Sequence, residues 1–172
     1  MYKDINIQID GLGIIVYSPF SVVHINEEED YLTQNYMSAQ QVADHVNRGT
    51  IVGFSTGSPG DYNLRVRTGY PDEKILDEFD FVLRLGLEVR NHELCIRDLY
   101  DLMEWTSELP GEQVIRLDNG YYHITVFSNL PDSKIRGDQQ EIYLYFNQLT
   151  EMPKIMYSGV PHLSDSRSQS NR

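Results

Sequence analysis

The sequence has one cysteine and no long apolar run, and each shortage excludes a class of protein. Cys95 has no second cysteine to pair with, so an internal disulfide is excluded and a reducing compartment is indicated. We expect a buried structural thiol, with a reactive nucleophile as the alternative. No stretch approaches the roughly 18 apolar residues of a membrane-spanning helix. Lys3, Asp4 and Asp10 interrupt any apolar signal core, so we expect a cytoplasmic protein that does not bind membranes.

Basic residues are also scarce. The 172 residues include 14 Lys and Arg against 26 Asp and Glu, a formal net charge of −12. Such a charge repels nucleic acid and anionic membranes and attracts basic partners. A well-solvated surface is the simpler interpretation of the same balance.

Signatures of catalysis and metal binding are missing. The five histidines form no H-x-H, H-E-x-x-H or Cys/His cluster, and there is no G-x-S-x-G elbow or P-loop. His24, two residues before an acidic run, leaves a divalent-ion site open as an alternative. With 26 acids, some close carboxylate pair is inevitable and therefore uninformative. The sequence predicts no enzyme, no cofactor, no metal and no catalytic residue.

Residues 79–90 are the clearest strand. Every odd position from Phe79 to Val89 is apolar, and four of the even positions are charged. This alternation predicts a long strand with one face on a core and one in water, around which the rest of the sheet is built.

Residues 38–48 are the clearest helix. Ser38 and Gln41 match a capping box, apolar residues recur at helical spacing from Ala39 to Val46, and Gly49 supplies a left-handed stop. Residues 97–105 are ambiguous between a short helical turn, which we favour, and a bent edge strand.

The remaining pattern is rich in strands. Strand-like pieces occupy residues 4–26, 50–54, 62–68, 94–96 and 141–147, and Asn119-Gly120 predicts a tight hairpin between residues 113–117 and 121–128. We expect a mainly β, antiparallel β-sandwich of about nine strands. One domain spans residues 1–161, and the Ser-rich residues 162–172 are predicted to be a disordered tail.

Tyrosines lie beside acids at several points, a composition suited to gripping a basic protein. Tyr70 and Tyr100 also neighbour acids, and two acidic segments stand out at residues 27–30 and 72–78. Ordinary solvent-exposed tyrosines are the alternative. The predicted partner-binding residues are Glu27, Glu28, Glu29, Asp30, Tyr31, Asp61, Tyr62, Asp72, Glu73, Asp77 and Glu78.

The order of elements resembles a known family. A strand-rich start, the capped helix, the strand Gly49-Thr50-Ile51-Val52-Gly53-Phe54, the long strand at 79–90 and the Leu-Asp-Asn-Gly-Tyr-Tyr entry at 117–122 follow one another. Over residues 15–130 this order is similar to that of the ComJ-type nuclease inhibitors and related small β-sandwich immunity proteins of bacterial toxin systems. The resemblance implies a cytoplasmic inhibitor that blocks a cognate toxin or nuclease, and it carries over no contact residue.

The hypothesis favoured by charge, composition and resemblance is an immunity protein that binds a cognate basic toxin or nuclease through an acidic, tyrosine-rich surface. Three alternatives remain open at this point. One is a carbohydrate-binding module with Trp105 and tyrosines as stacking platforms, the second an enzyme using carboxylates or histidine, and the third a structural protein acting by self-association.

Overall fold

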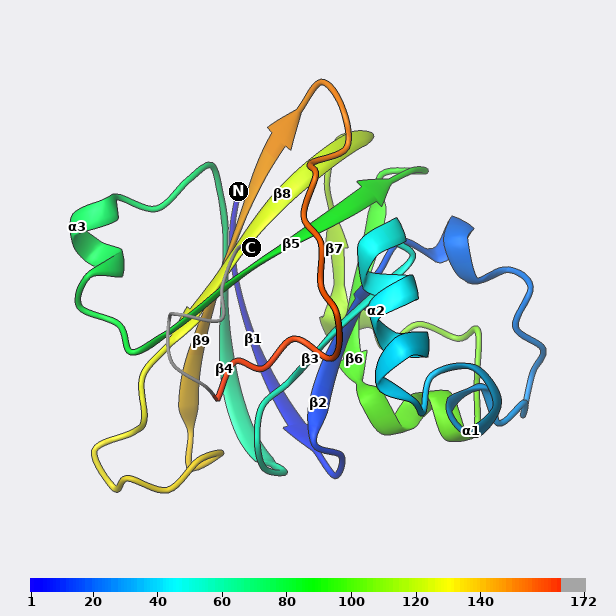
Figure 1. The fold of residues 1–172 in the computed structure, drawn as a ribbon, viewed down its shortest axis with the longest axis horizontal. Coiled ribbons are helices and arrows are strands. Elements are labelled where there is room, and N and C mark those ends of the chain that lie inside the picture. The colour runs from blue at the N-terminus through cyan, green and yellow to red at the C-terminus, as the bar shows by residue number, and fades with distance from the viewer. Residues whose placement is uncertain (165–172) are drawn as a thin grey trace.

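A computed structural model describes residues 1–164 of the chain, and it places two β-sheets face to face (Figure 1). The first sheet has five strands in the order β1-β4-β9-β8-β5. Its strands are β1 (Tyr2–Ile9), β4 (Gly60–Thr68), β9 (Gln140–Leu149), β8 (Gly120–Ser128) and β5 (Phe81–Val89).

The second sheet is antiparallel throughout and has the order β3-β2-β6-β7. Its strands are β3 (Ile51–Ser55), β2 (Gly13–Tyr17), β6 (Glu93–Asp98) and β7 (Val114–Arg116).

Helical segments are short and lie outside the sheets. The three α-helices are α1 (Tyr31–Asn35), α2 (Ala39–Arg48) and α3 (Glu73–Leu76), and the three 3-10 turns are η1 (Pro19–Val22), η2 (Leu99–Met103) and η3 (Gly111–Gln113). The short helical turn favoured for residues 97–105 is η2, and the acidic segment at residues 72–78 contains α3.

The β-rich sandwich is confirmed, but an entirely antiparallel one is wrong. β9 pairs antiparallel with β8 and parallel with β4. The first sheet joins two antiparallel pairs, β1 with β4 and β5 with β8, and β9 inserted between them matches the direction of only one neighbour. The sheet is therefore mixed.

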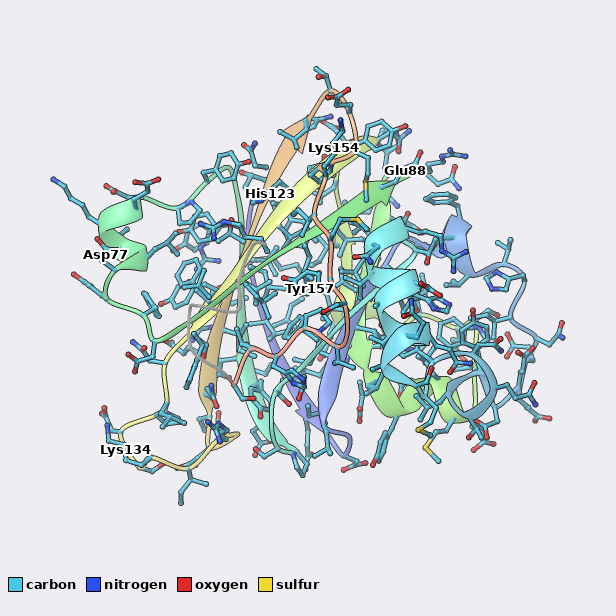
Figure 2. All side chains as sticks on the ribbon, in the orientation of Figure 1. Asp77, Glu88, His123, Lys134, Lys154 and Tyr157 are labelled. Carbon is cyan, nitrogen blue, oxygen red and sulfur yellow. The ribbon has the colours of Figure 1, made fainter. Side chains whose placement is uncertain are left out.

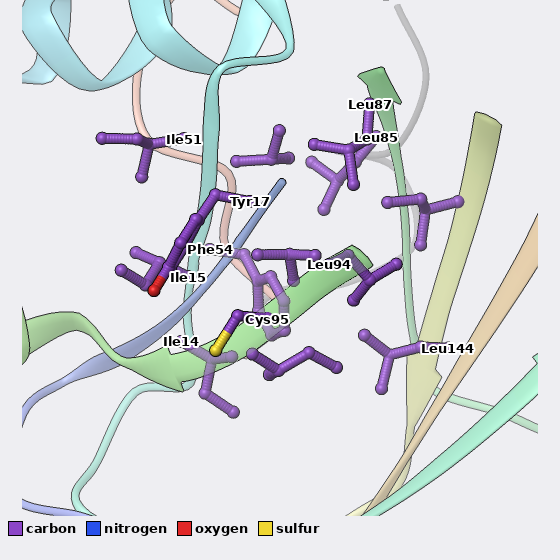
Figure 3. Close-up of a cluster of buried hydrophobic side chains, with 14 of the residues drawn as sticks. Ile14, Ile15, Tyr17, Ile51, Phe54, Leu85, Leu87, Leu94, Cys95 and Leu144 are labelled. Carbon is purple, nitrogen blue, oxygen red and sulfur yellow. The ribbon is translucent and has the colours of Figure 1, made fainter. Parts of the chain in front are cut away.

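The core lies between the sheets, and alternation explains it. In β5, Leu83, Leu85 and Leu87 are at most 2% exposed, and Figure 3 shows Leu85 and Leu87 within the core. The expectation that the sheet is built around this strand is wrong, because β5 is an edge strand of its sheet. Its outer face is also partly covered, since Val82 packs with Leu76 of α3 and Gly86 lies close to Pro153.

The helix α2 forms as its sequence predicts. Gln41 N donates to Ser38 Oγ at 3.1 Å, and the Gln41 side chain accepts from Ser38 N, so the capping box is complete. Gly49 has a φ of +67°, a left-handed conformation that glycine adopts without steric cost.

The hairpin predicted at Asn119-Gly120 is wrong. β7 pairs with β6 in the second sheet, whereas β8 pairs with β5 and β9 in the first, so residues 117–120 cross between sheets. The Asn119 side chain holds this crossing, because its Oδ1 accepts from His92 N at 2.8 Å.

The segment after β9 closes the gap between the sheets at the β5 and β3 edges (Figures 1 and 2). Tyr157 donates its hydroxyl to Arg84 O at 2.6 Å and its backbone pairs with the Asn47 side chain of α2. Leu163 is 2% exposed and donates its N–H to Ser55 O. The predicted tail therefore begins too early: residues 162–164 pack on β3, and residues 165–172 lie outside the described residues.

Candidate partner-binding surface

The two predicted acidic segments lie on opposite sides of the molecule. Residues 27–30 lead into α1 at the right of Figure 1, and residues 72–78 surround α3 at the left, where Figure 2 labels Asp77. They therefore form two separate patches.

The first segment is bonded to a second acidic stretch that is far away in sequence. Glu28 N donates to Trp105 O at 2.7 Å, and Trp105 N donates to Glu29 O at 3.1 Å. Ser107 N donates to Glu27 Oε1 at 2.7 Å, and this bond lowers the pKa of Glu27. The β1–β2 turn joins the group, because Asp10 N donates to Asp98 Oδ2 at 2.8 Å.

These contacts join two stretches of the chain that contain acids but no Lys or Arg. We call residues 10–37 together with residues 98–109 the acidic end. It contains nine of the 26 acids of the chain and none of its 14 Lys and Arg. The nine acids are Asp10, Glu27, Glu28, Glu29, Asp30, Asp98, Asp101, Glu104 and Glu108.

Arg97, the base that directly precedes residues 98–109 in the sequence, is neutralised internally. Arg97 is 3% exposed, its Nε lies 2.8 Å from Asp101 Oδ2, and its Nη1 donates to Thr106 O at 2.8 Å. The guanidinium also lies over the Trp105 ring, 4.8 Å from its centroid. Arg97 therefore fixes the local backbone and offers no positive charge to solvent.

Some of the acids are held in place by their own hydrogen bonds. Asp30 caps α1 by accepting from Thr33 N at 3.1 Å, which lowers the pKa of Asp30, and Glu29 accepts from Asn26 N. Within residues 1–164, the side chains of Glu28, Glu104 and Glu108 make no hydrogen bond or ion pair. These three carboxylates are the ones a partner would meet without breaking an internal contact.

The tyrosines divide into buried and exposed members. Tyr31 and Tyr62 are 6% and 1% exposed, so neither ring reaches a partner in this structure, and their prediction as surface residues is wrong. Tyr31 packs between helices with its hydroxyl 2.7 Å from His45 Nε2, and Tyr62 faces the core from β4 and donates to Ser58 O. Tyr70 and Tyr100 are 55% and 43% exposed.

The second predicted segment, residues 72–78, lies at the outer face of the first sheet. Asp72 caps α3 by accepting from Lys74 N at 2.9 Å, and Leu76 of that helix packs on Val82 and Phe127 at the outer face of the first sheet. Asp61 is exposed at the start of β4, where its N–H donates to Gly137 O. Glu73, Asp77 and Glu78 are exposed around α3.

An apolar cleft of about 480 Å³ is lined in part by residues of the acidic end. Its walls come from α1, α2, β3, η2 and the β1–β2 turn, with Leu32 and Phe54 among the buried lining residues. The sequence predicted residues 27–30 of the acidic end, but neither their contact with residues 105–107 nor this cleft. The shortage of bases in the acidic end is visible in the sequence, since no Lys or Arg occurs between Lys3 and Arg48 or between Arg97 and Arg116.

Four further observations concern the metal, thiol, sugar and membrane alternatives. Within residues 1–164, no group of three or more His, Cys, Asp and Glu is placed to hold a metal ion. Cys95 is fully buried, and burial raises the pKa of its thiol. Trp105 is 2% exposed, so it provides no stacking platform for a sugar. None of the described helices is long and apolar enough to cross a bilayer.

Comparisons with known proteins inform the fold. No protein-family model and no curated protein matches this chain. A protein described as crocagin biosynthetic gene J superposes with a TM-score of 0.56 at 11% identity, covering 84% of this chain and 96% of its own. The crystal structure of ComJ from Bacillus subtilis, an inhibitor of the DNA-degrading activity of NucA, gives a TM-score of 0.48 at 11% identity, covering 86% and 96%. At 11% identity, the superposition on the crocagin biosynthesis protein shows a similar fold and nothing further.

Proposed function

We propose that this chain is a non-enzymatic, cytoplasmic immunity protein that binds and blocks a basic protein toxin, a nuclease, through its acidic end. The observation that carries the proposal is the concentration of nine acids and no Lys or Arg in two segments that hydrogen bonds bring together.

Electrostatics supports a basic partner. Nucleases bind the phosphate backbone with Lys and Arg, and a surface that presents carboxylates in fixed positions competes for the same groups. Complementary charge raises the association rate and selects against acidic proteins. The acidic end suits this role because several of its carboxylates are already oriented by backbone N–H groups, which reduces the ordering cost of binding.

The test uses charge reversal at carboxylates that have no internal role. The variant Glu28→Lys/Glu104→Lys/Glu108→Lys changes the acidic end without removing a cap or an ion pair. A matched control, Glu73→Lys/Glu78→Lys/Asp132→Lys, makes the same change in net charge on exposed acids around α3 and the 129–139 loop. The tagged protein captures partners from a lysate of the organism that encodes it, and mass spectrometry identifies them.

The captured protein is then purified, assayed for nuclease activity and titrated with the wild type and both variants. We expect a basic nuclease whose activity falls to zero at an equimolar ratio. We also expect the acidic-end variant to lower its association rate roughly tenfold or more at low salt, and the control variant to change it little. The proposal would be overturned if the captured protein associates with the acidic-end variant as fast as with the wild type, or if it has no nuclease activity.

A further inference from the structure

The cleft beside the acidic end gathers exposed apolar side chains from three separate parts of the chain. Leu12, Met37, Tyr100 and Met103 line it and are 52%, 59%, 43% and 47% exposed. They are four of the eleven large apolar side chains that stand exposed among residues 1–164. Four such side chains around one concave site indicate an interaction surface, whereas isolated exposed apolar residues are ordinary.

The lining suits an inserted side chain. Buried residues such as Leu32 and Phe54 form the apolar interior, and the volume of about 480 Å³ lies within the roughly 300–1,000 Å³ typical of ligand clefts. Met37 and Met103 come from different elements, since Met37 follows α1 and Met103 ends η2. Methionine side chains adapt to occupants of different shape because they are unbranched and polarisable.

Among residues 1–164, no Asp or Glu lines the cleft itself, but acids lie next to several of its lining residues along the chain. Asp98 and Asp101 lie on either side of Tyr100 in the sequence, Glu104 follows Met103, and Asp30 caps the helix that supplies Leu32. An apolar cleft with acids beside it in the chain therefore matches an apolar side chain with basic neighbours.

Two other occupants fit less well. A second copy of this chain would bring its own acidic end against this one, and like charges at close range oppose that contact. The eight residues after Ser164 read Asp-Ser-Arg-Ser-Gln-Ser-Asn-Arg and contain no apolar side chain to insert. The chemistry therefore favours a different protein.

We propose that the cleft receives an apolar side chain of Leu, Met or Phe size from a linear segment of the partner, with Lys or Arg on both sides of it. This inference rests on the proposed function and specifies how the basic partner is held. The acids beside the cleft attract the basic residues, Glu104 being the one whose carboxylate makes no contact of its own within residues 1–164, and the apolar residue anchors the segment.

Synthetic peptides test the cleft without the natural partner. The first peptide carries Leu at positions i and i+4 with Lys elsewhere, the second replaces both Leu by Ser, and the third keeps Leu and replaces Lys by Glu. Each carries a fluorescent label, and anisotropy measures its affinity for the whole chain at low and moderate salt. Burying one Leu-sized side chain is worth about tenfold to a hundredfold in affinity, so the first peptide should exceed the second by that ratio.

Matched variants locate the site. Met37→Asn/Met103→Asn changes two exposed lining residues, whereas Ile75→Asn/Ile135→Asn changes two exposed apolar residues at α3 and in the 129–139 loop. We expect the first variant to weaken binding of the Leu–Lys peptide about tenfold while leaving the Ser–Lys peptide unaffected. We expect the second variant to change neither. Thermal melts establish that both variants are folded.

The outcomes separate this inference from the proposed function. Equal binding of the Leu–Lys and Ser–Lys peptides, or no binding of either, would overturn the anchoring role of the cleft. Equal binding of the Leu–Lys and Leu–Glu peptides would overturn the basic character of the occupant. Neither result decides whether a basic nuclease is inhibited, which the charge-reversal titration measures independently.

Discussion

Arg97 offers a direct test of how the acidic end is held together. Its guanidinium contacts the Asp101 carboxylate, the Thr106 carbonyl and the Tyr17 hydroxyl, at 2.8, 2.8 and 3.2 Å. The variant Arg97→Met keeps the length of the apolar stem and removes all three contacts. It leaves the Asp101 carboxylate without its ion-pair partner and removes the Arg97 hydrogen bond to the Tyr17 hydroxyl.

The magnitude follows from burial. Breaking a buried ion pair by removing one partner costs about 3–5 kcal/mol, because the remaining charge is left unpaired. The Asp101 side chain is 36% exposed and water recovers part of this loss, so we expect a decrease in the free energy of unfolding of about 2–4 kcal/mol. In a domain of this size each kcal/mol shifts Tm by about 2–4 °C, which gives a decrease of roughly 4–16 °C.

A matched ion pair provides the control. Arg116 lies 2.7 Å from Glu93, a separation close to that of Arg97 and Asp101, but its side chain is 71% exposed. Arg116→Met should therefore cost about 1 kcal/mol or less. Urea unfolding followed by circular dichroism measures both variants. If Arg97→Met is no more destabilising than Arg116→Met, burial does not set the strength of this contact and the reasoning fails.

Two further predictions concern the helices beside the cleft. The His45 Nδ1–H donates to Gln41 O at 2.8 Å, so Nε2 accepts from the Tyr31 hydroxyl, and burial lowers the pKa of His45 below its ordinary 6.5. Because the unfolded chain then binds a proton at this histidine more readily, the contribution of His45 to the free energy of unfolding should be complete above pH 6.5. It should be lost as the pH falls through the lowered folded-state pKa. The variant His45→Gln should lose less stability over the same pH range, and an identical pH profile in the variant would refute this. Ser38→Ala removes the side-chain cap of α2 and should cost about 1 kcal/mol in urea unfolding, whereas Ser38→Asp should restore most of it; equal losses would argue against capping.

Local signals in the sequence predicted local structure. The capping box at Ser38 and the stop at Gly49 act within one helix, so α2 could be predicted almost to the residue. Alternation likewise identified the core-facing side of β5. Alternation says which face of a strand is buried but not which strand lies beside it, so the parallel β4–β9 pairing and the edge position of β5 could not be predicted.

The candidate site depended on contacts that local patterns do not encode. Tyr31 follows an acid in the sequence, yet it is buried because α1 packs against α2 and places its hydroxyl on His45. The backbone bonds between Glu28 and Trp105 join two acidic stretches that are separated by some 75 residues in the chain, a pairing that only the fold supplies. The shortage of Lys and Arg is visible in each stretch separately, but it forms one acidic surface only because the fold brings the two stretches into contact.

The acids and the cleft should control different steps of binding. Glu28, Glu104 and Glu108 lie in solvent, where charge acts over about 8–10 Å at physiological salt and mainly raises the rate of encounter. Met37 and Met103 act only after contact, when an apolar side chain leaves water, so their loss shortens the lifetime of the complex. We therefore expect the charge-reversal variant to lower mainly the association rate, measured by stopped flow, and the methionine variant to raise mainly the dissociation rate. Added salt should lower the association rate of the wild type as the charge reversals do. It should leave the dissociation rate of the methionine variant close to its low-salt value. Equal effects of both variants on association would mean that the cleft and the acidic end act as one electrostatic surface, and the anchoring step would then have no kinetic support.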